Sequence, residues 1–131
     1  MNARWKRSST CVYNIGYHII WCPKYRKRIL VGNVESRLKE ILLDKSIEIG
    51  CIIDTMETMP DHIHLFIKAP PTLAIAKIVQ TLKGYSAYIL RKEFYHLNRM
   101  KSLWTRSYYC ETVGHISQKT VTKYIQEQKQ K

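Results

Sequence analysis

Alternation of apolar and polar side chains predicts four β-strands in this chain. Successive side chains of a strand point to opposite faces, so alternation is typical of a sheet with one face in the core and one face free. The strands predicted in this way cover residues 10–22, 51–58, 62–69 and 103–112.

The third of these strands separates its two faces most clearly. Its aliphatic face consists of Ile63, Leu65 and Ile67. Its other face carries His62, His64, Phe66 and Lys68. This division predicts a core on one side of the sheet and an open, functional surface on the other.

Apolar residues that recur every three to four positions predict helices over residues 34–49, 72–94 and 117–128. Gly50 stands where a residue just past a helix end belongs, and Thr72 is the expected N-cap of the second helix. Gly84 interrupts that helix at a cost of about 1 kcal/mol. It is either simply tolerated, or it permits close approach of a backbone or a phosphate.

The order of these elements predicts an α+β fold. A βαββαβ order is that of the ferredoxin-like arrangement, an antiparallel sheet with helices on one face, here followed by a C-terminal helix. We expect residues 1–131 to form a single domain. Residues 1–9 are expected to be a basic arm, ordered by a partner if at all, and residues 95–102 a basic connection.

The net charge of the chain indicates what kind of partner it binds. Twenty-two Lys and Arg residues against ten Asp and Glu give a net charge of +12. A small chain this basic usually binds a polyanion, because counterions released from phosphates drive association. The densest positive cluster is Lys24-Tyr25-Arg26-Lys27-Arg28, where the aromatic side chain favours phosphate contact with base stacking over a merely solvated connection.

Cysteine spacing and hydropathy indicate the cellular compartment. The four cysteines at positions 11, 22, 51 and 110 lack zinc-like spacing, which predicts buried thiols in an intracellular protein. No apolar run reaches the roughly 18 residues of a membrane span, and no signal peptide is recognisable, so we expect a cytoplasmic protein.

His62 and His64 are candidate metal ligands. Side chains two positions apart on a strand leave the same face about 6.6 Å apart, so two imidazoles can converge on one ion. An isolated pair of this kind is more often just two partly exposed residues. The C-terminal helix could supply the second half of such a site, because Tyr124 and Gln128 share one face of this helix. The Gln128 carbonyl could complete the metal site, with Tyr124 facing a phosphate bound to the metal.

Several segments together carry a family resemblance. The segments are M-P-D-H-I-H, P-P-T-L-A-I-A-K-I-V-Q-T-L-K-G, T-V-x-K-Y-I-x-x-Q, W-C-P-K-Y-R-K-R-I-L and L-W-T-R-S-Y-Y-x-x-T-V-G. From about residue 13 to 128, the chain resembles the single-tyrosine HUH transposases, the TnpA-type enzymes of the insertion-sequence 200/605 family and their REP-associated relatives.

The resemblance implies a metal-dependent transposase that cleaves and rejoins single-stranded DNA at element ends through a 5′-phosphotyrosine intermediate. It also implies recognition of DNA hairpins, a homodimer, and Mg²⁺ or Mn²⁺ as the metal. Tyr124 matches the nucleophile, and His62, His64 and Gln128 match the metal ligands. Candidate DNA-binding residues are Lys24, Arg26, Lys27, Arg28, Lys83, Gly84 and Arg106.

Two other functions fit the same sequence. One is a noncatalytic single-stranded nucleic-acid-binding module that uses the open sheet face. The other is a domesticated HUH nickase that acts on chromosomal repeats. Whether Tyr124 acts on its own subunit or on a partner stays open, and the remaining histidines, His18, His96 and His115, are expected to be structural or surface residues, with His18 a weaker candidate for the open face.

Overall fold

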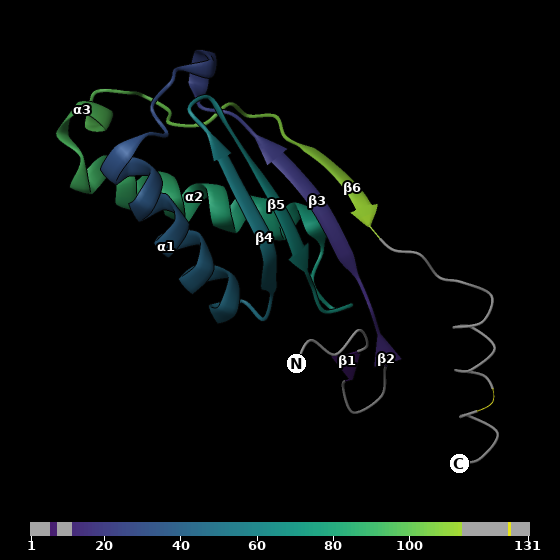
Figure 1. The fold of residues 1–131 in the computed structure, drawn as a ribbon. Coiled ribbons are helices and arrows are strands. Elements are labelled where there is room, and N and C mark those ends of the chain that lie inside the picture. Colours follow the sequence, from purple (N-terminus) through teal and green to yellow (C-terminus); the bar gives the residue numbers. More distant parts are fainter. Residues whose placement is uncertain (1–5, 8–11, 114–125, 127–131) are drawn as a thin grey trace.

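Four antiparallel strands form the main sheet, in the order β4-β5-β3-β6. The structure is a computed structural model, and it describes residues 6–7, 12–113 and 126. The strands are β3 (Gly16–Trp21), β4 (Ile52–Met59), β5 (His62–Lys68) and β6 (Tyr109–Val113). Helices α1 (Gly32–Glu48) and α2 (Ile75–Glu93) cover one face (Figure 1). The predicted ferredoxin-like α+β fold is confirmed.

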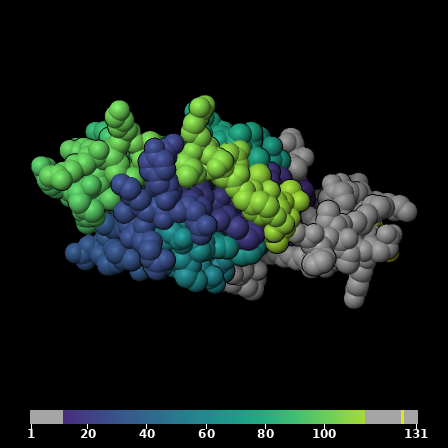
Figure 2. Space-filling model, turned by 90° about the horizontal axis from the view of Figure 1, so that it is seen from above, coloured from purple at the N-terminus to yellow at the C-terminus, as the bar shows by residue number. Residues whose placement is uncertain are grey.

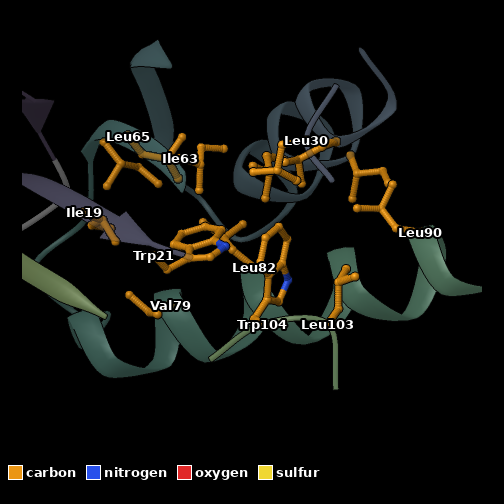
Figure 3. Packing of buried hydrophobic residues seen from close by; sticks show 14 of the residues in the cluster. Ile19, Trp21, Leu30, Ile63, Leu65, Val79, Leu82, Leu90, Leu103 and Trp104 are labelled. Carbon is orange, nitrogen blue, oxygen red and sulfur yellow. The ribbon is translucent and has the colours of Figure 1, made fainter. Parts of the chain in front are cut away.

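The core lies between the sheet and the two helices. Ile19, Ile63 and Leu65 contribute from the strands, and Leu82 from α2, each with no exposed surface (Figure 3). The rings of Trp21 and Trp104 meet edge to face, with centroids 5.8 Å apart. Trp104 Nε1 donates a hydrogen bond of 3.1 Å to the buried Ser86 Oγ, which satisfies the indole N–H away from water.

The N-terminal part differs from the prediction in two ways. The predicted strand over residues 10–22 is divided into β2 (Val12–Tyr13) and β3, and the arm contains β1 (Lys6–Arg7). Lys6 pairs with Tyr13 and Arg7 with Val12, so these two arm residues form a short ladder with the chain's own backbone. The rest of the arm lies outside the described residues.

Thr72 does not cap α2, so that prediction is wrong. The chain first makes a turn in which Leu73 N donates to Pro70 O, and Ala74 is the N-cap residue, without a side-chain hydrogen bond. Pro71 stands at the second position of this turn, where its fixed φ is favourable, so the turn precedes the helix.

The segment before β6 also differs from the prediction. A short helix, α3 (Tyr95–Asn98), lies where a plain connection was expected. β6 begins six residues later than the predicted strand, because Leu103 and Trp104 are both buried, and alternation cannot bury two consecutive residues on one face. The segment that follows β3 and the segment that precedes β6 are joined by two backbone hydrogen bonds, from Lys24 N to Leu103 O and from Thr105 N to Cys22 O. Figure 2 shows the surface of the molecule on which β6 lies.

Two smaller predictions can be compared with the structure. Gly84 is exposed, and a Cβ placed there would meet no described atom within 4 Å outside its own stretch of helix, so no other backbone approaches this glycine closely within residues 12–113, while the approach of a phosphate stays a prediction. Cys51 is buried as expected, but Cys110 is exposed, because β6 is the edge strand and all five of its residues are exposed. None of the helices described is both long and apolar enough to cross a membrane.

Candidate active site

The two predicted ligand histidines lie side by side on the sheet face opposite α1 and α2, which we call the open face. His62 pairs across the sheet with Met59 and His64 with Glu57. Their ring centroids are 5.0 Å apart, with the ring planes inclined by 63°. Since Ile63 between them is fully buried, the alternation of β5 fixes both rings on the open face.

Asp61 holds the ring of His62. Asp61 Oδ1 lies 2.8 Å from His62 Nδ1, and Arg26 donates from Nη2 to Asp61 Oδ2 at 2.9 Å. The hydrogen bond with His62 lowers the pKa of Asp61, and Arg26 lowers it further. An ionised carboxylate can only accept, so Asp61 favours the His62 tautomer with hydrogen on Nδ1 and a free electron pair on Nε2.

His64 has a different set of neighbours. His64 Nδ1 lies 3.1 Å from His18 Nε2, and His18 Nδ1 lies 3.2 Å from Glu111 Oε1. Burial lowers the pKa of His64, and the nearby His62 and His18 lower it further. The neutral imidazole, which is the form that binds a metal, is therefore favoured.

Two imidazole donors with free Nε2 atoms fit a metal ion, but they make up only part of its shell. In the part of the chain that the structure describes, neither Nε2 makes a hydrogen bond, and no group of three His, Cys, Asp or Glu side chains could hold a metal. The third nearby ring, His18, has its Nε2 engaged by His64. A metal ion bound to these two histidines would need further ligands from other groups. Tyr124 and Gln128, predicted to supply the nucleophile and a third ligand, lie outside the described residues.

The basic cluster, residues 24–28, is exposed beside this site. It includes the short helix η1 (Lys24–Arg26), where Tyr25 and Arg26 have left-handed backbone, with φ of 59° and 52°. Tyr25 is 80% exposed, and Arg26, Lys27 and Arg28 are exposed as well. Because Arg26 also binds Asp61, this positive surface is linked directly to the ring of His62.

Two of the other DNA-binding candidates lie around the segment before β6. Lys83 Nζ donates to the carbonyl oxygens of Thr105 and Ser107, at 2.5 and 3.2 Å, and burial lowers its pKa. Lys83 thus holds this segment in place. Arg106 is exposed and lines a surface hollow together with Lys83, Gln80 and Tyr108.

Comparison with known proteins identifies the family. Residues 11–128 match the family model "Transposase IS200 like". The chain belongs to the IS200-like transposase family. It is 41% identical to the ISDra2 transposase TnpA of Deinococcus radiodurans, over 96% of this chain and 92% of the relative. It is 32% identical to the IS200 transposase of Salmonella typhimurium, over 88% and 78%.

Solved structures agree with this assignment. A Deinococcus radiodurans protein described as a transposase is 36% identical and superimposes with a TM-score of 0.79, over 94% of this chain and 97% of that one. A REP-associated tyrosine transposase bound to a REP hairpin superimposes with a TM-score of 0.61, over 93% and 67%, at 10% identity, and so shares the fold. The predicted enzyme class, a transposase, is confirmed.

Sequence reasoning missed part of this transposase's site. His18 was at most a weak candidate for the open face, and neither Glu111 nor Tyr109 was recognised. The polar face of the first strand marked His18, but its contact with His64 depends on the register between β3 and β5. That register brings together residues 46 positions apart, and no local pattern specifies it.

Proposed function

We propose that this transposase cleaves and rejoins single-stranded DNA by attack of Tyr124 on a phosphodiester held at His62 and His64. The observation that carries the proposal is the pair of imidazoles on the open face, each with Nδ1 engaged and with no hydrogen bond at Nε2 from any described residue. A noncatalytic nucleic-acid binder would have no use for two histidines fixed in this way.

The residues would divide the chemistry between them. His62 and His64, with Gln128 as the proposed third ligand, would hold Mg²⁺ or Mn²⁺, which would stabilise negative charge on a non-bridging phosphate oxygen. The Tyr124 oxygen loses its proton and forms a bond to phosphorus, and the bond from phosphorus to the 3′ oxygen breaks. The 3′ oxygen gains a proton and leaves as a hydroxyl group.

This step leaves a 5′-phosphotyrosine link between the protein and the DNA. One phosphodiester replaces another, so little free energy is lost and a 3′-hydroxyl can attack the link to rejoin the strand. Cutting and joining therefore need no nucleotide cofactor. The enzyme would act as a homodimer, with Tyr124 serving its own or its partner's histidines.

The basic cluster supports DNA as the substrate and a hairpin as the recognised feature. Exposed Lys27 and Arg28 provide phosphate contacts, and the exposed ring of Tyr25 can stack on an unpaired base. A relative with the same fold was solved bound to a REP hairpin. We expect DNA affinity to fall steeply with salt, and to be higher for hairpins with single-stranded flanks than for plain duplex.

The test is formation of a covalent adduct with single-stranded oligonucleotides taken from the DNA that flanks the reading frame. The wild-type protein with Mn²⁺ should give an adduct that resists denaturation. The adduct should be lost with a chelator, in His64→Ala and in Tyr124→Phe. Tyr95→Phe is the matched control, because Tyr95 is 75% exposed on α3. An adduct that persists in Tyr124→Phe would contradict the assignment of the nucleophile.

A further inference from the structure

A line of hydrogen bonds crosses the open face from β6 through β3 to β5. Glu111 Oε1 lies 3.2 Å from His18 Nδ1, and His18 Nε2 lies 3.1 Å from His64 Nδ1. The register pairs Glu111 with His18 across β3 and β6, so the sheet itself sets this contact. Tyr109 donates to Glu111 Oε2 at 2.9 Å, which holds the carboxylate from its other oxygen.

The direction of these hydrogen bonds follows from the chemistry of the groups. A carboxylate has no hydrogen to donate, so His18 Nδ1 must be the donor to Glu111. In its neutral form His18 has only this one N–H, so its Nε2 is then an acceptor. His64 must then donate from Nδ1, and its own Nε2 keeps a free electron pair.

Packing keeps the His18 ring in this orientation. The ring stacks on Phe66, with centroids 4.5 Å apart and planes within 5° of each other. Tyr109 meets it edge-on at 6.1 Å. The His18 side chain is only 16% exposed, so the ring has few other positions to adopt.

We propose that His18, held by Glu111, is a positioning residue that fixes His64 in the tautomer whose Nε2 binds the metal. The inference rests on the proposed function, in which His64 is a metal ligand. His18 thus accepts from His64 Nδ1 as Asp61 accepts from His62 Nδ1, and Glu111 acts on His64 through the ring of His18. Partners behind a ligand typically change metal affinity by about 10–100-fold when removed.

Two variants of His18 distinguish the effect of its hydrogen-bond acceptor, Nε2, from the effect of its ring packing. His18→Phe keeps a ring between Phe66 and Tyr109 but removes the acceptor. His18→Gln restores an acceptor, the side-chain carbonyl oxygen, without the ring. His96→Phe is the matched control, because His96 is an exposed histidine on α3.

Two measurements on the full chain test the proposal. Long-range ¹H–¹⁵N spectra of the metal-free protein report the His64 tautomer, and calorimetric titration with Mn²⁺ reports affinity. We expect hydrogen on Nδ1 of His64 in the wild type and in His18→Gln, and a mixture of tautomers in His18→Phe. Mn²⁺ affinity should fall about 10–100-fold in His18→Phe, recover largely in His18→Gln and stay unchanged in His96→Phe.

The outcomes distinguish this inference from the function on which it rests. Hydrogen on Nε2 of His64 in the wild type, or full Mn²⁺ affinity in a folded His18→Phe, would overturn the positioning role. If His64→Ala kept full Mn²⁺ affinity, the proposed metal site itself would be wrong. Loss of affinity in His64→Ala but not in His18→Phe would refute only the role of His18.

Discussion

Asp61 offers a graded test of how His62, a proposed metal ligand, is held in place. Replacing Asp61 with Ala removes the acceptor 2.8 Å from His62 Nδ1, so the ring can rotate or change tautomer. We expect Mn²⁺ affinity to fall by about 10–100-fold. Asp61→Asn keeps a carbonyl oxygen that can accept the same hydrogen bond, so its loss should be smaller.

Arg26 should affect metal affinity much less than Asp61 does, because its side chain is more exposed to solvent. Its side chain is 70% exposed, while that of Asp61 is 18% exposed. Because solvent screens the charge of the exposed guanidinium, this ion pair contributes little to holding Asp61 in place. Arg26→Gln should therefore weaken Mn²⁺ binding by no more than about fivefold.

Calorimetric titration with Mn²⁺ in the absence of DNA measures this order directly, since it separates metal binding from phosphate contacts of Arg26. The expected order of affinity loss is Asp61→Ala, then Asp61→Asn, then Arg26→Gln. Unchanged affinity in Asp61→Ala, or a larger loss in Arg26→Gln than in Asp61→Ala, would refute the reasoning.

Three further predictions concern stability. Ser86→Ala leaves the buried Trp104 N–H without its acceptor and should lower the free energy of unfolding in urea by about 1–3 kcal/mol; an unchanged value would contradict the buried hydrogen bond. Gly84→Ala should raise it by about 0.5–1 kcal/mol, because the added Cβ meets no described atom within 4 Å; a decrease would reveal a contact at this position. Hydrogen bonds from Arg37 lower the pKa of Glu93, so the stability they provide is present above the ordinary value of 4.5 and is lost as the pH falls through the lowered pKa. Glu93→Gln should therefore lose less stability than the wild type on acidification, and equal losses would argue against this ion pair.

The sequence predicted the elements whose patterns are local. Alternation along a strand predicted that His62 and His64 share one face and that Ile63 lies on the other. The structure confirms this, because the two rings are neighbours and Ile63 is buried. The order of strands and helices was sufficient to predict the ferredoxin-like sheet. The motif that carried the family resemblance includes Asp61, yet nothing in the sequence showed that this side chain binds His62.

What the sequence could not predict depends on contacts between distant segments. The contact of His18 with His64 and that of His18 with Glu111 each follow from the register of two strands. Trp104 was assigned to the predicted strand over residues 103–112, but it lies before β6, with its indole buried against Trp21 and Ser86. Tertiary packing overrides local propensity in such places.

The two proposed ligands, His62 and His64, are supported from opposite sides of the open face. Asp61 binds His62 from the turn before β5, and this carboxylate also binds Arg26 of the basic cluster. Glu111 supports His64 from β6 through His18. Each ligand thus has its own carboxylate, and the one behind His62 belongs to a surface that we propose contacts DNA.

The most direct test of the proposed mechanism is the chemical identity of the protein–DNA link. The adduct formed with single-stranded DNA would be digested with protease and nuclease and analysed by mass spectrometry. We expect one modified peptide, with a nucleotide attached through its 5′ phosphate to Tyr124. A nucleotide attached to any other residue, or through a 3′ phosphate, would contradict the mechanism.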